Sequence, residues 1–288
     1  MPALYVAADA AARKGRRIYV WLVRADLALL VAGALLGVIV DQLSPPQRTP
    51  ARVGAAVLLA AAMLVKSSNH IRRPDHDWFG GRAAAETVKT TAWRYMMRVS
   101  PLDGPDGEAD TKFAAILREA LMARRELRLD LARLSVDARQ ITARMRAVRG
   151  SGLAERKGVF LRERVEDQIR WYVARAEENR QRAELWFWIA LIANFGAVVF
   201  AMTRLVIPES PTPNFESVFA AAAAAATAWN QLGRHDELTK SYALAAQELM
   251  ILRGLVEQAL DEASLAALVM EVEAAISREH TMWVAKRG

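Results

Sequence analysis

Residues 185–207 read LWFWIALIANFGAVVFAMTRLVI, a nearly unbroken apolar run. The hydrocarbon core of a bilayer is about 30 Å thick, and a helix rises about 1.5 Å per residue, so roughly 20 apolar residues are needed to cross it. This stretch therefore predicts a membrane-spanning helix, and it decides the fold class of the chain.

Three more apolar stretches accompany it, at residues 25–43, 51–65 and 215–232. The four stretches fall into two pairs, and the members of each pair are separated by a short linker. The first is long enough to span if Asp26 and Asp41 lie near its ends, whereas the second is short and the fourth is alanine-rich. We predict four spans, arranged as two transmembrane hairpins.

Composition supports a membrane protein and excludes several kinds of chemistry. Hydrophobic residues make up 53% of the chain and charged residues 25%, and the two kinds are segregated along the sequence. Because there is no cysteine, disulfides, thiolate nucleophiles and cysteine-based zinc sites are excluded. The four histidines lack the spacing of known metal sites, and no phosphate-loop, dinucleotide or hydrolase motif is present. We therefore predict no enzyme activity, no metal and no cofactor.

The flanks of the spans predict the topology. Lysine and arginine gather before the first span, after the second, before the third and after the fourth, and the two hairpin tips are poor in them. An excess of these residues marks the cytoplasmic side. Both termini and the middle of the chain are predicted to be cytoplasmic in a multi-pass inner-membrane protein. A signal peptide over residues 13–43 is the alternative, but no clear cleavage site follows it.

The middle of the chain predicts a long helix. From Phe113 to Val148, apolar residues recur at alternating steps of four and three, and only Arg124 breaks the series. This pattern is typical of a coiled-coil seam, and it predicts one helix over residues 112–149 that ends at residues 150–152 and pairs with the helix that follows. The expected fold is an all-α membrane protein with two transmembrane hairpins and a cytosolic antiparallel coiled-coil stalk. The expected domains are residues 1–110, 111–184 and 185–288.

The net charge is concentrated in this middle part. Residues 112–183 carry 18 Lys/Arg and 10 Asp/Glu, which accounts for the whole net charge of +7 of the chain. Such an excess is suited to anionic lipid headgroups, a nucleotide or nucleic acid. The alternative is a solvated coiled-coil surface on which arginine and glutamate pair at helical spacing.

One motif is specific. Residues 82–98 read RAAAETVKTTAWRYMMR, and Arg82, Glu86 and Lys89 share one helical face. A hairpin followed by R-x-x-A-E-x-x-K-T-x-A-W-R-Y resembles the SLATT family, two-transmembrane effector domains associated with bacterial nucleotide-synthase and nucleotide-sensor gene clusters. The second half of the chain resembles another copy without the K-T-x-A-W-R-Y stretch, so we expect the two halves to have different roles.

The resemblance implies a bacterial inner-membrane effector of antiviral defence. Such a protein would be a homo-oligomeric pore or ion channel, opened or held closed by a nucleotide or short oligonucleotide. A partner nucleotidyltransferase or nucleotide sensor would act through that ligand. The partners implied are therefore the lipid bilayer, a second copy of the chain and the nucleotide.

Two sets of residues are candidates for this function. The basic residues near or after the motif are candidates for phosphate binding: Arg82, Lys89, Arg94, Arg98, Arg124 and Arg128. The polar residues within the predicted spans are candidates for lining a pore or for packing between spans: Asp26, Asn194, Glu216 and Thr227.

Alternatives remain at this stage. The motif helix can instead lie on the membrane surface as a salt-bridged helix, with Trp93 and Tyr95 as interfacial anchors. The whole protein can instead be a non-conducting membrane scaffold that recruits a partner through its coiled coil. A membrane-bound enzyme is disfavoured because its motifs are missing.

Overall fold

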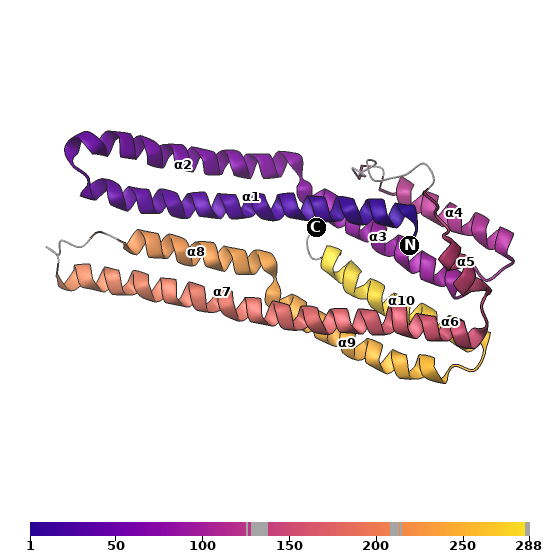
Figure 1. Cartoon of the computed structure of the whole chain (residues 1–288). Helices are drawn as coiled ribbons and strands as arrows, with labels where there is room; N and C mark the ends of the chain where they lie inside the picture. Colours follow the sequence, from indigo (N-terminus) through magenta and orange to yellow (C-terminus); the bar gives the residue numbers. More distant parts are fainter. Residues whose placement is uncertain (125, 128–137, 208–212, 214, 286–288) are drawn as a thin grey trace. The chain divides into compact units, whose positions relative to one another are not determined.

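The computed structural model describes all residues except 125, 128–137, 208–212, 214 and 286–288, and the side chains of residue 41 and of residues 279–285 are also not described. The described residues form helices and contain no strand, as predicted. The elements in chain order are α1 (Ala3–Gln42), α2 (Pro45–Arg72), α3 (Pro74–Met96), α4 (Asp106–Met122), α5 (Ala143–Gly150), α6 (Leu153–Phe160), the π-helical segment η2 (Leu161–Glu166), α7 (Asp167–Val206), α8 (Glu216–Gly233), α9 (His235–Gln258) and α10 (Glu262–Ala285) (Figure 1).

The chain divides into two compact units. Unit 1 consists of Met1–Arg17, Pro74–Ala176 and Lys240–Gly288. Unit 2 consists of Ile18–Arg73 and Glu177–Thr239. Unit 2 therefore holds the apolar hairpins, and unit 1 holds the charged middle of the chain together with both ends.

Unit 2 is built from two helical hairpins, α1–α2 and α7–α8 (Figure 1). Glycines allow the helices of each hairpin to pack closely. A Cβ atom at Gly33 of α1 would lie 3.3 Å from the Leu59 side chain of α2, and one at Gly196 of α7 would lie 2.7 Å from the Phe219 ring of α8. The Arg24 guanidinium lies 5.0 Å from the Trp229 ring centroid, so the two hairpins also contact each other.

Three helical stretches in the described part of the chain are long and apolar enough to cross a membrane: Ala3–Val40, Pro45–Met96 and Leu153–Val206. Their apolar portions correspond to the first three predicted spans. The fourth predicted span, α8, is not among them. The hairpins nevertheless have apolar surfaces suited to contact with lipid, because large apolar side chains such as Met63, Phe195 and Leu205 are more than two-thirds exposed.

Both hairpins end in the same kind of elbow. Arg73 follows α2 in the left-handed region with φ 44°, and its N–H donates to the Asn69 carbonyl oxygen at 3.1 Å. Arg234 follows α8 with φ 49°, and its N–H donates to the Asn230 carbonyl oxygen at 3.0 Å. A non-glycine residue in this region is uncommon. The shared Asn-x-x-x-Arg elbow therefore marks the two halves as structural repeats.

The core of unit 1 is formed around α3. The start of α1 packs on α3 through small residues: Ala8 is fully buried beside Ala84 and Ala85, and a Cβ atom at Gly81 would lie 2.8 Å from the Ala8 carbonyl oxygen. α4, α5 and α10 contact the rest of α3. The aromatic rings of Trp93 and Tyr95 on α3 lie inside this core rather than on its surface.

The predicted continuous helix over residues 112–149 is wrong. α4 ends at Met122 and α5 begins at Ala143, and the described residues between them are not helical. Asp110 near the start of α4 forms an ion pair with Arg146 of α5 at 2.5 Å. In one straight helix these two residues would be about 54 Å apart, so the fold requires the chain to reverse between them. Residues Leu131 and Leu134 of the predicted seam lie outside the described residues.

The reversal has a local cause as well. The Thr142 side chain caps α5 by accepting a hydrogen bond from the Met145 N–H, so a helix start is encoded inside the heptad pattern. The apolar positions Phe113, Leu117 and Ala120 are buried in the core of unit 1, together with Met145. The heptad pattern therefore marks buried faces of two short helices, and the described residues form no long coiled-coil stalk.

Candidate functional site

The most highly charged buried site of unit 1 is centred on Arg164, in η2. The Arg164 side chain is fully buried, and its Nε and Nη2 atoms donate to the two Glu273 carboxylate oxygens at 2.7 and 2.6 Å. Nη2 also donates to Glu86 Oε1 at 3.0 Å. One arginine thus joins Glu86 of α3 to Glu273 of α10. We refer to Arg164, Glu86 and Glu273 as the arginine centre.

Neighbouring side chains complete this centre. The Thr90 hydroxyl of α3 donates to Glu273 Oε2 at 2.7 Å. Burial lowers the pKa of Lys89, and the Arg164 charge lowers it further, against the opposite effects of Glu86 and Glu273. Burial alone would raise the pKa of Glu86, but Arg164 and Lys89 outweigh it and hold this pKa below its usual value.

Arg164 belongs to a column of buried side chains along α6 and η2. Arg156, Phe160 and Arg164 follow one another at four-residue steps, and each is at most 1% exposed. On the α3 side, the Trp93 ring meets the Phe160 ring edge-on, with centroids 5.7 Å apart. The seam between α3 and α6–η2 therefore contains both an aromatic pair and the buried Arg164, which binds Glu86 of α3.

A second buried arginine fixes the corner between α3 and α4. Arg149 of α5 donates from Nε to Asp106 at 2.8 Å, from Nη1 to the carbonyl oxygens of Tyr95 and Leu102 at 2.7 Å each, and from Nη2 to the Gly104 carbonyl oxygen at 2.6 Å. Each of its nitrogens therefore has an acceptor, which is the usual condition for a buried arginine.

The structure distributes the predicted phosphate-binding residues over several local contacts. The Arg82 guanidinium lies 5.6 Å from the Trp171 ring centroid. Arg94 donates from Nη2 to the Ser100 carbonyl oxygen at 2.6 Å, and the exposed Arg98 donates from Nε to the Arg149 carbonyl oxygen at 3.0 Å. Lys89 lies beside the arginine centre. Arg128 lies outside the described residues.

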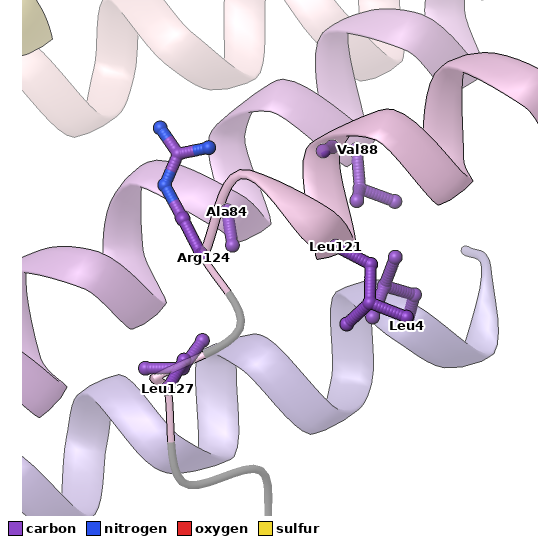
Figure 2. A pocket seen from close by; sticks show the side chains of 7 residues that line it. Leu4, Ala84, Val88, Leu121, Arg124 and Leu127 are labelled. Carbon is purple, nitrogen blue, oxygen red and sulfur yellow. The ribbon is translucent and has the colours of Figure 1, made fainter.

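Arg124 lines a shallow cleft between the start of α1, α3 and the end of α4 (Figure 2). The other lining side chains are apolar: Leu4, Ala84, Val88, Ala120, Leu121 and Leu127. Such a lining offers apolar contact and a single guanidinium, so the cleft alone is a poor phosphate site.

Trp93 and Tyr95 are not interfacial anchors. They are 3% and 0% exposed and contact Phe160 and Phe113 within the core of unit 1. The Tyr95 hydroxyl donates to Asp110 Oδ1 at 2.7 Å, and burial together with this carboxylate raises the pKa of Tyr95 to about 12. The burial of both rings contradicts their role as interfacial anchors in the alternative of a motif helix that lies on the membrane surface.

The predicted polar residues of the spans differ in exposure. Asn194 of α7 is exposed, and its Nδ2 donates to the Ala190 carbonyl oxygen at 2.9 Å, one turn back. Thr227 of α8 is also exposed, whereas Asp26 and Glu216 are half-buried. The exposed pair is available to a neighbouring molecule, because neither side chain faces the interior of unit 2.

Sequence reasoning missed the buried arginines Arg149, Arg156 and Arg164. A signal was present in the sequence. Arg156 has Gly152, Leu153, Val159 and Phe160 at the positions three and four residues away, so no neighbouring carboxylate of its own helix can pair with it. An arginine surrounded by apolar residues at helical spacing is a candidate for burial.

Two family models match the chain, one over each half. Residues 2–157 match the family model described as "SMODS and SLOG-associating 2TM effector domain 3", and residues 160–283 match "SMODS and SLOG-associating 2TM effector domain 1". The first match alone covers more than half of the chain. The chain belongs to the SLATT family. Comparisons with curated proteins and with solved structures gave no match.

The residues of the arginine centre come from both SLATT domains. Glu86 and Thr90 lie in the first SLATT domain, and Arg164 and Glu273 lie in the second. The centre therefore links the two SLATT domains of one chain. The two domains and the three long apolar stretches indicate a membrane protein, and the SLATT family consists of effector domains associated with defence systems that have a sensor or synthase partner.

Proposed function

We propose that this SLATT protein is an inner-membrane effector of bacterial antiviral defence that assembles into a homo-oligomeric pore or ion channel. A nucleotide or oligonucleotide, made or sensed by a partner protein, opens the channel or holds it closed. Both termini and unit 1 lie in the cytoplasm, and all four hairpin helices, α8 included, span the membrane. One contrast carries the proposal. The hairpins of unit 2 expose large apolar side chains, whereas the polar side chains of unit 1 are joined by hydrogen bonds and ion pairs.

The hairpins need an apolar environment. The side chains of Phe195, Leu205 and Met63 are each at least 70% exposed in the single chain. At about 25 cal/mol per Å², such surfaces are costly in water and stable in lipid. The exposed Asn194 lies among them on α7, and a polar side chain at membrane depth faces a partner or a water-filled path more often than lipid. An oligomer in which Asn194 of several copies meets accounts for both features.

Unit 1 supports the ligand-binding part of the proposal. It carries the basic residues assigned to phosphate contacts: Arg82, Lys89, Arg94, Arg98 and Arg124, with Arg128 outside the described residues. α1 and α7 each contribute residues to both units, so these two helices connect the ligand-binding part directly to the spans. A ligand that changes the packing of unit 1 can therefore act on the spans through continuous helices.

The described residues do not contain the feature on which the scaffold alternative depends. It required a long coiled coil as the docking site for a partner, and the described residues between α4 and α5 form no continuous helix.

Ion flux from liposomes that contain the full-length protein tests the proposal. The flux is measured without ligand and with a panel of cyclic and linear oligonucleotides. The expected result is a leak that at least one nucleotide switches on or off. A protein that is folded and inserted but gives no leak under any condition contradicts the proposal.

Three variants make this test specific. Asn194→Leu is expected to abolish the leak, whereas Ile192→Leu, a conservative exchange at an exposed apolar site of the same span, is expected to leave it unchanged. Joint replacement of Lys89, Arg94 and Arg98 by Gln is expected to abolish the response to ligand. An unchanged response would contradict the assigned phosphate contacts while leaving the channel itself supported.

A further inference from the structure

Among the described residues of unit 1, the three buried arginines differ in how many of their nitrogens have acceptors. Arg149 has acceptors for Nε, Nη1 and Nη2. Arg164 has acceptors for Nε and Nη2, and Arg156 has one for Nη2 alone. No described residue accepts from Nε or Nη1 of Arg156 or from Nη1 of Arg164. Arg156 is therefore the least satisfied of three equally buried guanidinium groups.

The pairing of Arg156 with its carboxylate differs from the pairing of Arg164. The Glu273 carboxylate accepts hydrogen bonds from both Nε and Nη2 of Arg164. These two nitrogens form the edge of the guanidinium that binds a planar anion through two parallel hydrogen bonds. Glu262, the first residue of α10, takes only Nη2 of Arg156 and leaves Nε without an acceptor. Of the two nitrogens on this edge of Arg156, Nε is therefore available to an acceptor that can bind both nitrogens together.

The same seam contains another buried donor without an acceptor. Trp93 Nε1 has no partner among the described residues, and its ring packs on Phe160, one helical turn from Arg156. A buried donor that stays unpaired destabilises the fold. The unpaired side-chain atoms of the described part of unit 1 are all donors, whereas those of unit 2 are the side-chain carbonyl oxygens of Asn69 and Asn230.

We infer that Arg156 is the centre of a binding site for a phosphoryl group, and that this group displaces the Glu262 carboxylate. A phosphate has several acceptor oxygens and can bind Nε and Nη2 together, which the single contact of Glu262 does not achieve. The Glu262 side chain is 57% exposed, so the displaced carboxylate moves into solvent at little cost. The same exposure gives the ligand a path to the edge of the buried Arg156.

Displacement of Glu262 has a consequence for the arginine centre. Glu262 is at the beginning of α10, and Glu273 of the same helix binds Arg164. Lys157, next to Arg156, donates to the carbonyl oxygens of Glu257, in the last turn of α9, and of Ala259, between α9 and α10, at 3.0 and 2.8 Å. A phosphoryl group at Arg156 therefore releases one of the contacts that fix the start of α10 and loosens the link between the two SLATT domains.

This inference rests on the proposed function, because it names a phosphate contact for the proposed nucleotide, and Arg156 was not among the predicted residues. Its test measures binding and not leak, so either can fail without the other. The probe is inorganic pyrophosphate, titrated by calorimetry into the full-length protein in detergent without anionic lipid. We expect saturable binding to the wild-type protein.

Three variants decide the outcome. Glu262→Gln removes the competing charge and is expected to tighten pyrophosphate binding several-fold, a gain that a destabilised fold does not produce. Arg156→Met is expected to weaken binding at least tenfold. Arg180→Met removes an exposed arginine paired with Glu177 and Glu184, and it is expected to leave the affinity unchanged.

The inference is overturned if the wild-type protein does not bind pyrophosphate, or if Glu262→Gln and Arg156→Met both bind it like the wild type. Equal weakening by Arg156→Met and Arg180→Met would also overturn it, because it would show general charge attraction and not a site. Since the Glu262→Gln arm requires a gain of affinity, the test stays decisive even if Arg156→Met fails to fold.

Discussion

The two SLATT domains share their hairpin elbow and differ in the helix that follows it. After the first elbow, α3 buries the hydroxyl side chain of Thr91 and the aromatic rings of Trp93 and Tyr95, and it half-buries Glu86. After the second elbow, α9 buries mostly small and aliphatic residues, such as Ala246, Leu249 and Val256. The first domain therefore provides a polar surface and the second provides the arginine that binds it. The two copies are complementary parts of one unit and not two equivalent modules.

The largest expected effect tests this complementarity directly. Arg164→Met leaves Glu86 and Glu273 without their shared cation, and breaking a buried pair in this way costs about 3–5 kcal/mol. Thermal unfolding of the full-length protein, followed by circular dichroism, measures the loss. Arg182→Met serves as the control, because Arg182 pairs with Glu178 on the exposed face of α7. Equal unfolding temperatures for the two variants would contradict the assigned role of the arginine centre.

Arg149→Met is the next largest change. It removes the donors to the carbonyl oxygens of Tyr95, Leu102 and Gly104, and leaving buried acceptors unpaired costs about 1–3 kcal/mol each before the structure relaxes. We expect a loss of about 3 kcal/mol in the free energy of unfolding, measured by urea titration. The loss belongs to the first SLATT domain alone, so hydrogen exchange in α9 should not increase before global unfolding.

Acid should weaken the link between the domains. The pKa of Glu86 is lower in the folded protein than its usual value of 4.5, so Glu86 stabilises the fold fully above that value. This stabilisation is lost as the pH falls through the lower folded pKa. Glu86→Gln should therefore remove part of the decline in unfolding temperature below pH 4.5, measured across a pH series. A decline as steep as in the wild-type protein would show that Glu86 does not contribute.

The elbows provide a comparison in which the two copies should agree. Arg73 and Arg234 both have a left-handed conformation that glycine adopts without strain. Arg73→Gly and Arg234→Gly should each stabilise the fold by up to about 1 kcal/mol. Parallel unfolding measurements in detergent test this expectation. A gain at one elbow with a loss at the other would contradict their structural equivalence.

Lys89→Met is expected to have the smallest effect on stability. Because the pKa of Lys89 is lowered in the folded protein, its charged form is disfavoured there, and removing the charge offsets the missing attraction to Glu86. We expect an unfolding temperature within about 1 °C of the wild-type value, corresponding to less than about 0.5 kcal/mol. A large fall would show that Lys89 is an essential member of the arginine centre.

The sequence was sufficient for the parts of the fold that follow from length and periodicity. The apolar run at residues 185–207 predicted a spanning helix, and the motif at residues 82–98 predicted α3 and the family. Periodicity failed between α4 and α5, because a heptad pattern looks the same in one long helix and in two short helices that fold back on each other. The Thr142 cap and the ion pair between Asp110 and Arg146 decide between these two, and the ion pair is a long-range contact.

The candidate site was predictable only in part. Glu86 and Lys89 were found from their spacing. Arg164 lies 78 residues from Glu86, and Glu273 lies 109 residues from Arg164, so helical spacing could not reveal these partners. The buried arginines looked like surface charge because arginine is common in this chain. For Arg156, apolar neighbours at helical spacing were a local signal that distinguishes it from exposed arginines such as Arg180, which has two glutamates within one turn.

We expect the two SLATT domains to act as one effector through the arginine centre. The most direct test is the ratio of ion flux with and without the active nucleotide in liposomes that contain Glu273→Gln, compared with the wild-type protein. This variant keeps the shape of Glu273 and removes its charge. We predict that the ratio falls towards one. A ratio equal to that of the wild-type protein, in a variant whose lower unfolding temperature shows that the centre is weakened, would contradict the claim.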